Sequence, residues 1–152
     1  MWSHWQTSRT LAAAGIITVL GVGGPPTNPQ GSQEITIGGT EYAFLGVPKT
    51  TAPGPTSFSF DNRGKMPHMM IIARLRDGIT PDSVLHTPAW AQGRLFGGGE
   101  GALVAAPGEG AVDHLMVPLA PGATYVLFCL ARNGPQQPPH IALGMFASFH
   151  VR

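Results

Sequence analysis

The sequence has little of what several protein classes depend on. Only 11% of its 152 residues are charged, nine basic and eight acidic, and the formal net charge is +1 with neutral histidines. These charges form no run, so the basic footprint of a nucleic-acid-binding protein is missing. A single cysteine excludes an intramolecular disulfide. An exported protein with one free thiol must bury it or bind it to a metal to protect it from oxidation.

Familiar catalytic patterns are also missing. The sequence contains no H-E-x-x-H zinc motif. The glycines from Gly97 to Gly101 are not followed by the lysine of a phosphate-binding loop, and Ser83 and Ser148 lack the setting of a nucleophile elbow. Nothing in the sequence pairs the sparse carboxylates. We therefore expect a protein that is not an enzyme.

Glycine and proline, in contrast, are abundant, with 21 and 15 residues. Together with 43% hydrophobic residues, they favour many short strands joined by turns over a helical bundle. The length suits one domain with its own hydrophobic core. The composition predicts an all-β domain, and we expect the protein to be a monomer.

The N-terminal region is typical of an export signal. Residues 1–10 carry Arg9 and no acid, and an apolar stretch follows from Leu11 to Val22. Its length suits the core of a signal peptide, whereas a membrane-spanning helix needs about 20 residues. We predict a signal peptide or N-terminal anchor over residues 1–24, a proline-rich linker over 25–33, and a domain over 34–152. The protein would be periplasmic or extracellular, and at a membrane only if the segment stays uncleaved.

The rest of the chain reads as short strands. Residues 56–60 alternate cleanly, with Phe58 and Phe60 on one face and serines on the other. Residues 34–47 suggest one long strand bent at Gly38 and Gly39. A loop and short-helix excursion off the sheet is expected over 77–110, with a helical turn at 81–85. The remaining strands are expected at 68–75, 111–119, 124–130 and 145–151, which predicts a Greek-key sandwich of about seven strands.

Four side chains with metal-binding chemistry lie at the ends of these strands. Cys129 ends one strand, His68 starts another, Met145 begins the last, and His140 lies in the connecting loop. Two imidazoles, one thiolate and one thioether form the set that copper uses in blue electron-transfer sites. The sequence therefore predicts one copper ion as cofactor, held at one end of the sandwich.

These residues give the chain a resemblance to the cupredoxin superfamily, in particular to small exported plastocyanin-like or azurin-like proteins. An asparagine-and-glycine turn precedes the first histidine in FDNRGKMPHMMIIARL, residues 60–75. A proline-glycine turn leads into an aromatic-rich strand that ends at Cys129, within residues 119–151. The resemblance implies a cupredoxin-like β-sandwich with His68, Cys129, His140 and Met145 as the copper ligands.

The chain departs from the family pattern at two places. Ten residues, 130–139, separate Cys129 from His140, where blue copper proteins usually have far fewer. Met69 also stands directly after the first histidine, where family members commonly have an asparagine that ties the ligand loops together. The residues that orient the ligands are therefore expected to differ here.

The resemblance implies a single-electron carrier. His140, on a loop near the surface, would be the electron exit, and a transient redox partner would dock near it through a modest apolar patch. One alternative is a copper carrier or buffer, in which Met66, Met69 and Met70 hold copper(I). Another is a metal-free cupredoxin-fold module that serves in binding or structure. The remaining histidines of the domain, His86, His114 and His150, are expected to be structural.

Overall fold

The structure is a computed structural model, and it describes residues 31–152. The predicted export segment and residues 25–30 of the predicted linker lie outside this range, so both remain predictions. Within the described residues, no helix is both long enough and apolar enough to cross a membrane.

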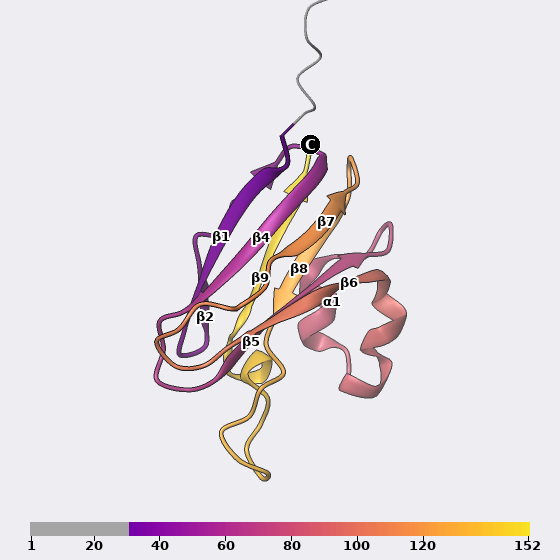
Figure 1. Ribbon diagram of the computed structural model, residues 1–152. Helices are drawn as coiled ribbons and strands as arrows, with labels where there is room; N and C mark the ends of the chain where they lie inside the picture. The colour runs from indigo at the N-terminus through magenta and orange to yellow at the C-terminus, as the bar shows by residue number, and fades with distance from the viewer. Residues whose placement is uncertain (1–30) are drawn as a thin grey trace, which may run out of the picture. The chain divides into compact units, whose positions relative to one another are not determined.

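The described chain folds into two β-sheets that pack face to face (Figure 1). The four-stranded sheet has the order β2-β1-β4-β7, and its strands are β1 (Gln33–Thr40), β2 (Ala43–Leu45), β4 (Gly54–Asn62) and β7 (Leu115–Leu119). The five-stranded sheet has the order β3-β9-β8-β5-β6, and its strands are β3 (Thr50–Thr51), β5 (His68–Leu75), β6 (Phe96–Ala105), β8 (Thr124–Phe128) and β9 (Phe146–Val151). The predicted all-β sandwich is confirmed, with two more strands than expected.

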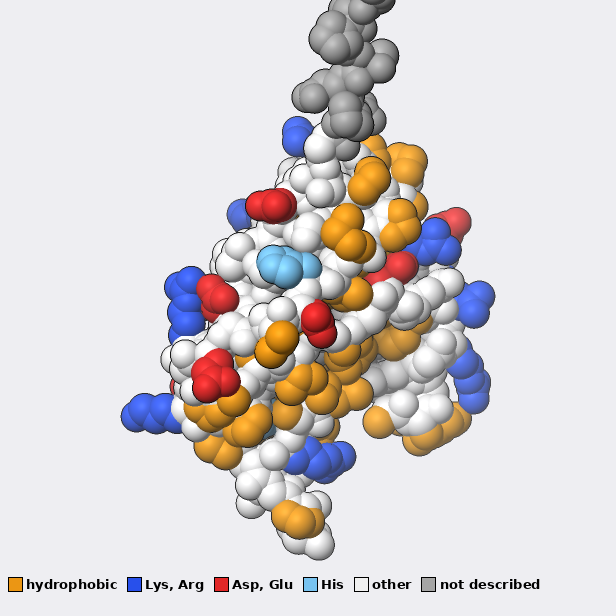
Figure 2. Space-filling model, in the orientation of Figure 1, with side chains coloured by type: hydrophobic (Ala, Val, Ile, Leu, Met, Phe, Trp, Pro, Cys, Tyr) orange, Lys and Arg blue, Asp and Glu red, His pale blue; other side chains and the backbone are white. Residues whose placement is uncertain are grey.

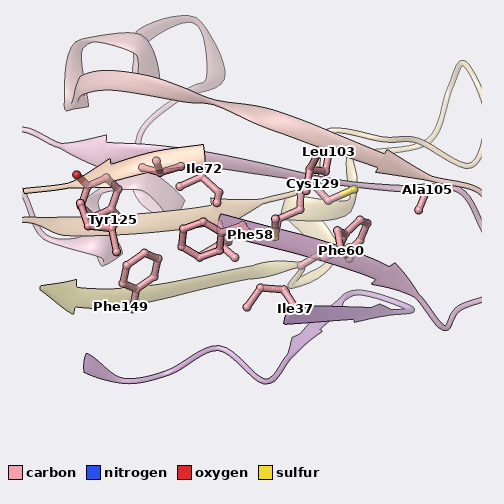
Figure 3. Close-up of a cluster of buried hydrophobic side chains, with 14 of the residues drawn as sticks. Ile37, Phe58, Phe60, Ile72, Leu103, Ala105, Tyr125, Cys129 and Phe149 are labelled. Atoms are coloured by element: carbon pink, nitrogen blue, oxygen red, sulfur yellow. The ribbon is translucent and has the colours of Figure 1, made fainter. Parts of the chain in front are cut away.

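The core between the sheets follows from period-two alternation. In β4, Phe58 and Phe60 are buried, while the alternating Ser57 and Ser59 face outward, as the sequence predicts. Tyr125 of β8 stacks on Phe149 of β9, with ring centroids 5.4 Å apart. Figure 3 shows these aromatic rings in one apolar layer, with the Cys129 sulfur at one end of it. The cysteine therefore lies where the core reaches the end of the sandwich.

Residues 34–47 do not form the single bent strand that was expected. They form a hairpin in which β1 and β2 pair antiparallel, with Thr40 opposite Ala43. Glu41 and Tyr42 make the turn, and Tyr42 has a φ of 63°. A left-handed residue reverses the chain more sharply than a bulge at the two glycines would. The turn carries Glu41 and Tyr42 to the end of the sandwich where Cys129 lies.

The prediction that residues 77–110 leave the sheet is wrong for their second half. Residues 96–105 form β6, an edge strand that pairs antiparallel with β5. The register shifts once between Gly99 and Gly101 and once between Phe96 and Gly98, and such bulges let a glycine-rich segment stay in a sheet. The helices of this segment, α1 (Pro81–His86) and the 3-10 helix η1 (Ala89–Leu95), lie off the sheet, which confirms the helical turn predicted at 81–85 (Figure 1).

These two helices cover the outer face of the five-stranded sheet. Val84 of α1 is fully buried and belongs to a small second core. The other buried members of this core are Ala73, Leu75, Val126, Phe128 and Ile141. Strands β5 and β8 are thus buried on both faces, and Ile141, the neighbour of His140, is held against them.

We expect Leu127→Ala to lower the free energy of unfolding by about 2–5 kcal/mol, because it opens a cavity in the main core. Leu127 is fully buried, whereas Leu130 is 46% exposed. Leu130→Ala, the matched control, is expected to change stability by about 0.5 kcal/mol or less. Urea denaturation of both variants measures the difference, and equal losses would contradict the placement of Leu127 in the core.

Candidate metal centre

Strand register brings the first two predicted ligands together. β5 and β8 are antiparallel neighbours, with Ile71 opposite Phe128. The start of β5, where His68 lies, is therefore beside the end of β8, which Cys129 follows. The backbone N–H of Met69 donates to the Cys129 sulfur over 3.4 Å. The pairing of β5 with β8 therefore brings His68 and Cys129 together, although they lie far apart in sequence.

The same register places Met145 at this corner. β8 and β9 pair with Phe128 opposite Phe146, and the Cys129 N–H donates to the Met145 carbonyl over 3.3 Å. The Met145 side chain is fully buried. A Cβ on Gly39 would stand 2.8 Å from the Phe60 ring and 3.3 Å from the Met145 methyl carbon, so the glycine leaves room for both side chains.

The ten residues between Cys129 and His140 form an excursion whose two ends are tied together. The His140 N–H donates to the Ala131 carbonyl over 2.9 Å, and the Ile141 N–H donates to the Cys129 carbonyl over 2.8 Å. Residues 132–139 loop outward between these bonds, at the lower end of the molecule in Figure 1. His140 then begins the 3-10 helix η2 (His140–Leu143), which Gly144 ends with a φ of 109°. The unusual spacing therefore does not carry the imidazole away from the thiol.

Three donor atoms meet at this corner. The Nδ1 atoms of His68 and His140 are 3.0 Å apart, and the Cys129 sulfur lies 3.5 Å from His140 Nδ1 and 4.0 Å from His68 Nδ1. All three side chains are fully buried. Metal bonds to imidazole nitrogen and thiolate sulfur are about 2.0–2.3 Å long, so donors at these separations can share one ion. The chemistry and spacing of the donor set fit a single soft metal ion.

Burial controls the protonation of this cluster. Removal from water lowers the pKa of His68, with the neighbouring His140 adding to the effect and Glu41 opposing it. Burial also lowers the pKa of His140, again against Glu41. Burial raises the pKa of the Cys129 thiol, while backbone N–H groups of Met69 and Ala131 oppose the shift. The metal-free cluster is therefore held neutral, with imidazole lone pairs available.

Hydrogen bonds of Asn62 fix the turn that precedes His68 and β5. The Asn62 amide donates to the carbonyls of Met66 and Ala105, over 2.8 and 3.0 Å, and its oxygen accepts from the Gly64 N–H over 2.9 Å. The asparagine-and-glycine turn noted in the sequence thus ties β4, β6 and the segment before His68 together. These hydrogen bonds tie the loops together, which the apolar side chain of Met69, directly after the histidine, cannot do.

The outer nitrogen of His68 has no hydrogen-bond partner within the described part of the chain. A Cβ on Gly64 would stand 3.0 Å from this Nε2 and 2.7 Å from a Glu41 carboxylate oxygen. Glu41 instead accepts a hydrogen bond from the Lys65 N–H. The carboxylate and the imidazole thus both lie against Gly64, where any side chain would collide with them.

His140 is more enclosed than the sequence suggested. Its side chain is fully buried, although Asn133, which contacts it, is exposed. Asn133 Oδ1 lies 2.7 Å from His140 Nε2, and Asn133 Nδ2 donates to the Tyr42 hydroxyl over 2.8 Å. Sequence reasoning missed both residues. Tyr42 is 98 positions from His140 in sequence, and no motif marks a contact between them.

The other candidate residues stay apart from this cluster. His86, His114 and His150 are exposed, and His86 pairs with Asp82 over 3.2 Å. Met69 and Met70 are consecutive residues of β5, so their side chains point to opposite faces of the sheet. Met70 is buried in the main core. Met69 and Met70 therefore cannot both bind one copper(I) ion in a thioether cluster.

Two sheets with a histidine, cysteine, histidine and methionine corner define a cupredoxin-like β-sandwich. The auracyanin of the photosynthetic bacterium Roseiflexus castenholzii, solved in its Na-dithionite-reduced form, matches with a TM-score of 0.52 and 20% identity. The match covers 80% of this chain and 98% of that chain. This likeness confirms the predicted fold.

Two further auracyanins match the chain less well. Auracyanin A of Chloroflexus aurantiacus, described as a "blue" copper protein, gives a TM-score of 0.49 at 22% identity, covering 80% of this chain and 100% of that one. Auracyanin B gives 0.49 at 15% identity, covering 79% and 88%. No protein-family model matches the chain, and no curated protein does.

We expect the metal-free protein to be most stable between pH 6.5 and 9.0, the ordinary pKa values of histidine and cysteine. Below 6.5 the unfolded chain protonates imidazoles that the folded protein keeps neutral, so the free energy of unfolding falls. Above 9.0 the unfolded thiol ionises while the buried thiol does not, and stability falls again. Urea denaturation across pH measures both limbs.

The exposed His114 provides the control for the acidic limb. His114→Gln should keep the loss of stability below pH 6.5, because His114 is exposed and lies outside the buried cluster. Stability that stayed constant on acidification through this range would contradict a buried neutral histidine pair.

Proposed function

We propose that this is an exported, type 1-like copper protein that carries single electrons, with His68, Cys129, His140 and Met145 as the copper ligands. The observation that carries the proposal is the burial of two imidazole nitrogens and one thiol within 4.8 Å of one another. Thioether and thiolate donors favour copper among the metals that imidazole also binds. The fold shared with a reduced auracyanin supports the same class of protein.

Bound copper would supply one-electron exchange, and the protein's part is to hold the donors still. Cys129 and Met145 are fixed by their backbone pairing, and His68 by the start of β5. His140 is fixed by two backbone hydrogen bonds at the neck of the 132–139 excursion. Ligands held on strand ends move little when the charge of the ion changes, which favours rapid electron transfer.

The buried cluster of His68, Cys129 and His140 gives less support to a metal-free structural or binding module. Among residues 31–152, no group hydrogen-bonds to the buried Nε2 of His68, and an unsatisfied group of this kind costs about 1–3 kcal/mol. A sandwich that served only as a structural or binding module would be at least as stable with apolar residues in these positions. Two buried histidines and a buried thiol thus favour a function that needs their donor atoms.

The partner we propose is a redox protein that docks at this end of the sandwich. Leu130 and Leu143 flank the ligand segment and are 46% and 41% exposed. On the face shown in Figure 2, acidic and basic side chains are interspersed, with no large field of one sign. These features suit a modest, apolar and short-lived contact. They offer little for long-range attraction by charge.

We expect the protein to take up one equivalent of copper(II) and to show an intense visible band from thiolate-to-copper charge transfer. Cys129→Ala should abolish the band, because it removes the thiolate. Titration followed by visible absorption and metal analysis measures both results. His114→Gln, the control at an exposed histidine, should leave the band and stoichiometry unchanged. Absence of stoichiometric copper uptake in either oxidation state would refute the proposal.

We expect Met145→Leu to retain one copper ion but to raise its reduction potential. A thioether donor stabilises copper(II) more than copper(I) at this position. Its removal therefore favours the reduced ion, which raises the reduction potential. Cyclic voltammetry of the copper-loaded protein measures the shift. The control is Met116→Leu at a 54% exposed methionine, which should leave the potential unchanged. An unchanged potential in Met145→Leu would show that Met145 is only a core residue.

A further inference from the structure

We propose that Asn133 and Tyr42 form a hydrogen-bonded cap that fixes the orientation and tautomer of His140 and closes the metal centre to solvent. The inference rests on the proposed function for its copper chemistry, although the cap is a feature of the metal-free protein. Asn133 and Tyr42 are positioning residues in this scheme, because they act only through His140.

The first support is a continuous chain of hydrogen bonds. With His140 Nε2 as donor, the Asn133 oxygen accepts over 2.7 Å, and the Asn133 NH₂ group donates to the Tyr42 hydroxyl over 2.8 Å. His140 Nδ1 is then unprotonated on the side that faces the Cys129 sulfur. A metal-bound histidine commonly donates its other N–H in this way, which sets the ring and its basicity.

The reversed assignment of the Asn133 amide does not suit a metal site. If the NH₂ group pointed at His140, its Nε2 would be the acceptor and Nδ1 would carry the proton. That proton would point between Cys129 and His68 and block the position that an ion needs. The orientation described for Asn133 is the one that leaves His140 ready to bind.

The second support is the enclosure of the ring. Tyr42 presents its edge to His140, with ring centroids 5.2 Å apart and an angle of 70° between the planes. Asn133 is itself exposed, yet His140 beneath it is fully buried. One residue layer, made of these two side chains, thus separates the imidazole from water. Removing either would let solvent reach the cluster.

The third support is the backbone of Tyr42. It is the one non-glycine residue with a positive φ, 63°, among those the structure describes. A left-handed conformation costs a residue with a Cβ about 1–2 kcal/mol. The Tyr42 carbonyl also lies 3.6 Å from where a Cβ on Gly144 would stand, so the turn contacts the segment that ends η2. A strained tyrosine held over a ligand is what a positioning role requires.

The fourth support is the internal bracing of the loop that carries Asn133. Arg132 donates through Nη1 to the Gln137 carbonyl over 2.7 Å, and the Gln137 N–H donates to the Gly134 carbonyl over 3.1 Å. These bonds join the two sides of the excursion. They hold Asn133 at a defined height above His140.

The test compares Asn133→Ala, Asn133→Asp and Tyr42→Phe with a matched control, Tyr125→Phe. Tyr125 lies in the core, and its hydroxyl accepts from the Ala120 N–H away from the cluster. In the metal-free protein, ¹⁵N NMR reports the His140 tautomer, and the rate of alkylation by iodoacetamide reports access to Cys129. Competition with a chelator then reports copper(II) affinity.

We expect wild-type His140 to carry its proton on Nε2. Asn133→Ala should lose this preference, speed alkylation of Cys129 and weaken copper(II) binding by about 10–100-fold, the usual effect of losing such a partner. Asn133→Asp, which still accepts from Nε2, should keep the tautomer. Tyr42→Phe should speed alkylation by less than Asn133→Ala, and Tyr125→Phe should match wild type in all three measurements.

The readouts separate failure of the cap from failure of copper binding. If Asn133→Ala kept the wild-type tautomer and the wild-type alkylation rate, the cap would be refuted, whether or not copper binds. If the wild-type protein took up no copper while Asn133→Ala changed tautomer and alkylation as expected, the cap would stand. Only the proposed copper function would then fail.

Discussion

The closure of the backbone around Cys129 is the constraint on which the metal centre depends. The residue is held between β5 and β9 by the register of β8, and its own carbonyl accepts the Ile141 N–H. This last bond returns the chain to its starting point after the excursion of residues 132–139. His140 is therefore delivered to the thiol by backbone geometry, independently of how many residues lie between. Without that closure, a ten-residue spacing would leave the second imidazole free to move.

The second constraint is energetic. A cluster of two imidazoles and a thiol is polar, yet it lies where the apolar core reaches the end of the sandwich. Burial keeps the histidines neutral by lowering the pKa of each, and it keeps the thiol protonated by raising the pKa of Cys129. Such a cluster costs stability in a metal-free fold, and a bound cation would offset part of that cost by binding the two Nδ1 atoms and the sulfur together. Burial thus lowers the stability of the metal-free protein. It also favours a metal ion that binds nitrogen and sulfur donors in place of water.

Much of the fold could be predicted because its signals are local. Clean alternation from Thr56 to Phe60 shows which face of that strand is buried, and the apolar run before Cys129 shows where a strand ends. The glycine-rich residues of β6 were placed outside the sheet, because glycines weaken the alternation signal, while the bulges that keep them paired depend on contacts with β5. The β1–β2 hairpin was missed for a related reason: its turn places Tyr42, rather than glycine or asparagine, in a left-handed conformation.

The candidate site divides in the same way. The metal-binding chemistry of the side chains and their order along the chain predict His68, Cys129, His140 and Met145. Each lies at or beside the end of a strand that the sequence predicts. Asn133 and Tyr42 could not be found, because their contacts depend on how the excursion folds back over the β1–β2 turn. The spacing that looked like a departure from the cupredoxin pattern is the segment that contributes Asn133. This loop supplies an acceptor for His140 Nε2, and the ring below it is fully buried. The ten-residue spacing thus gives the second histidine a defined hydrogen-bond partner within the loop that connects it to Cys129.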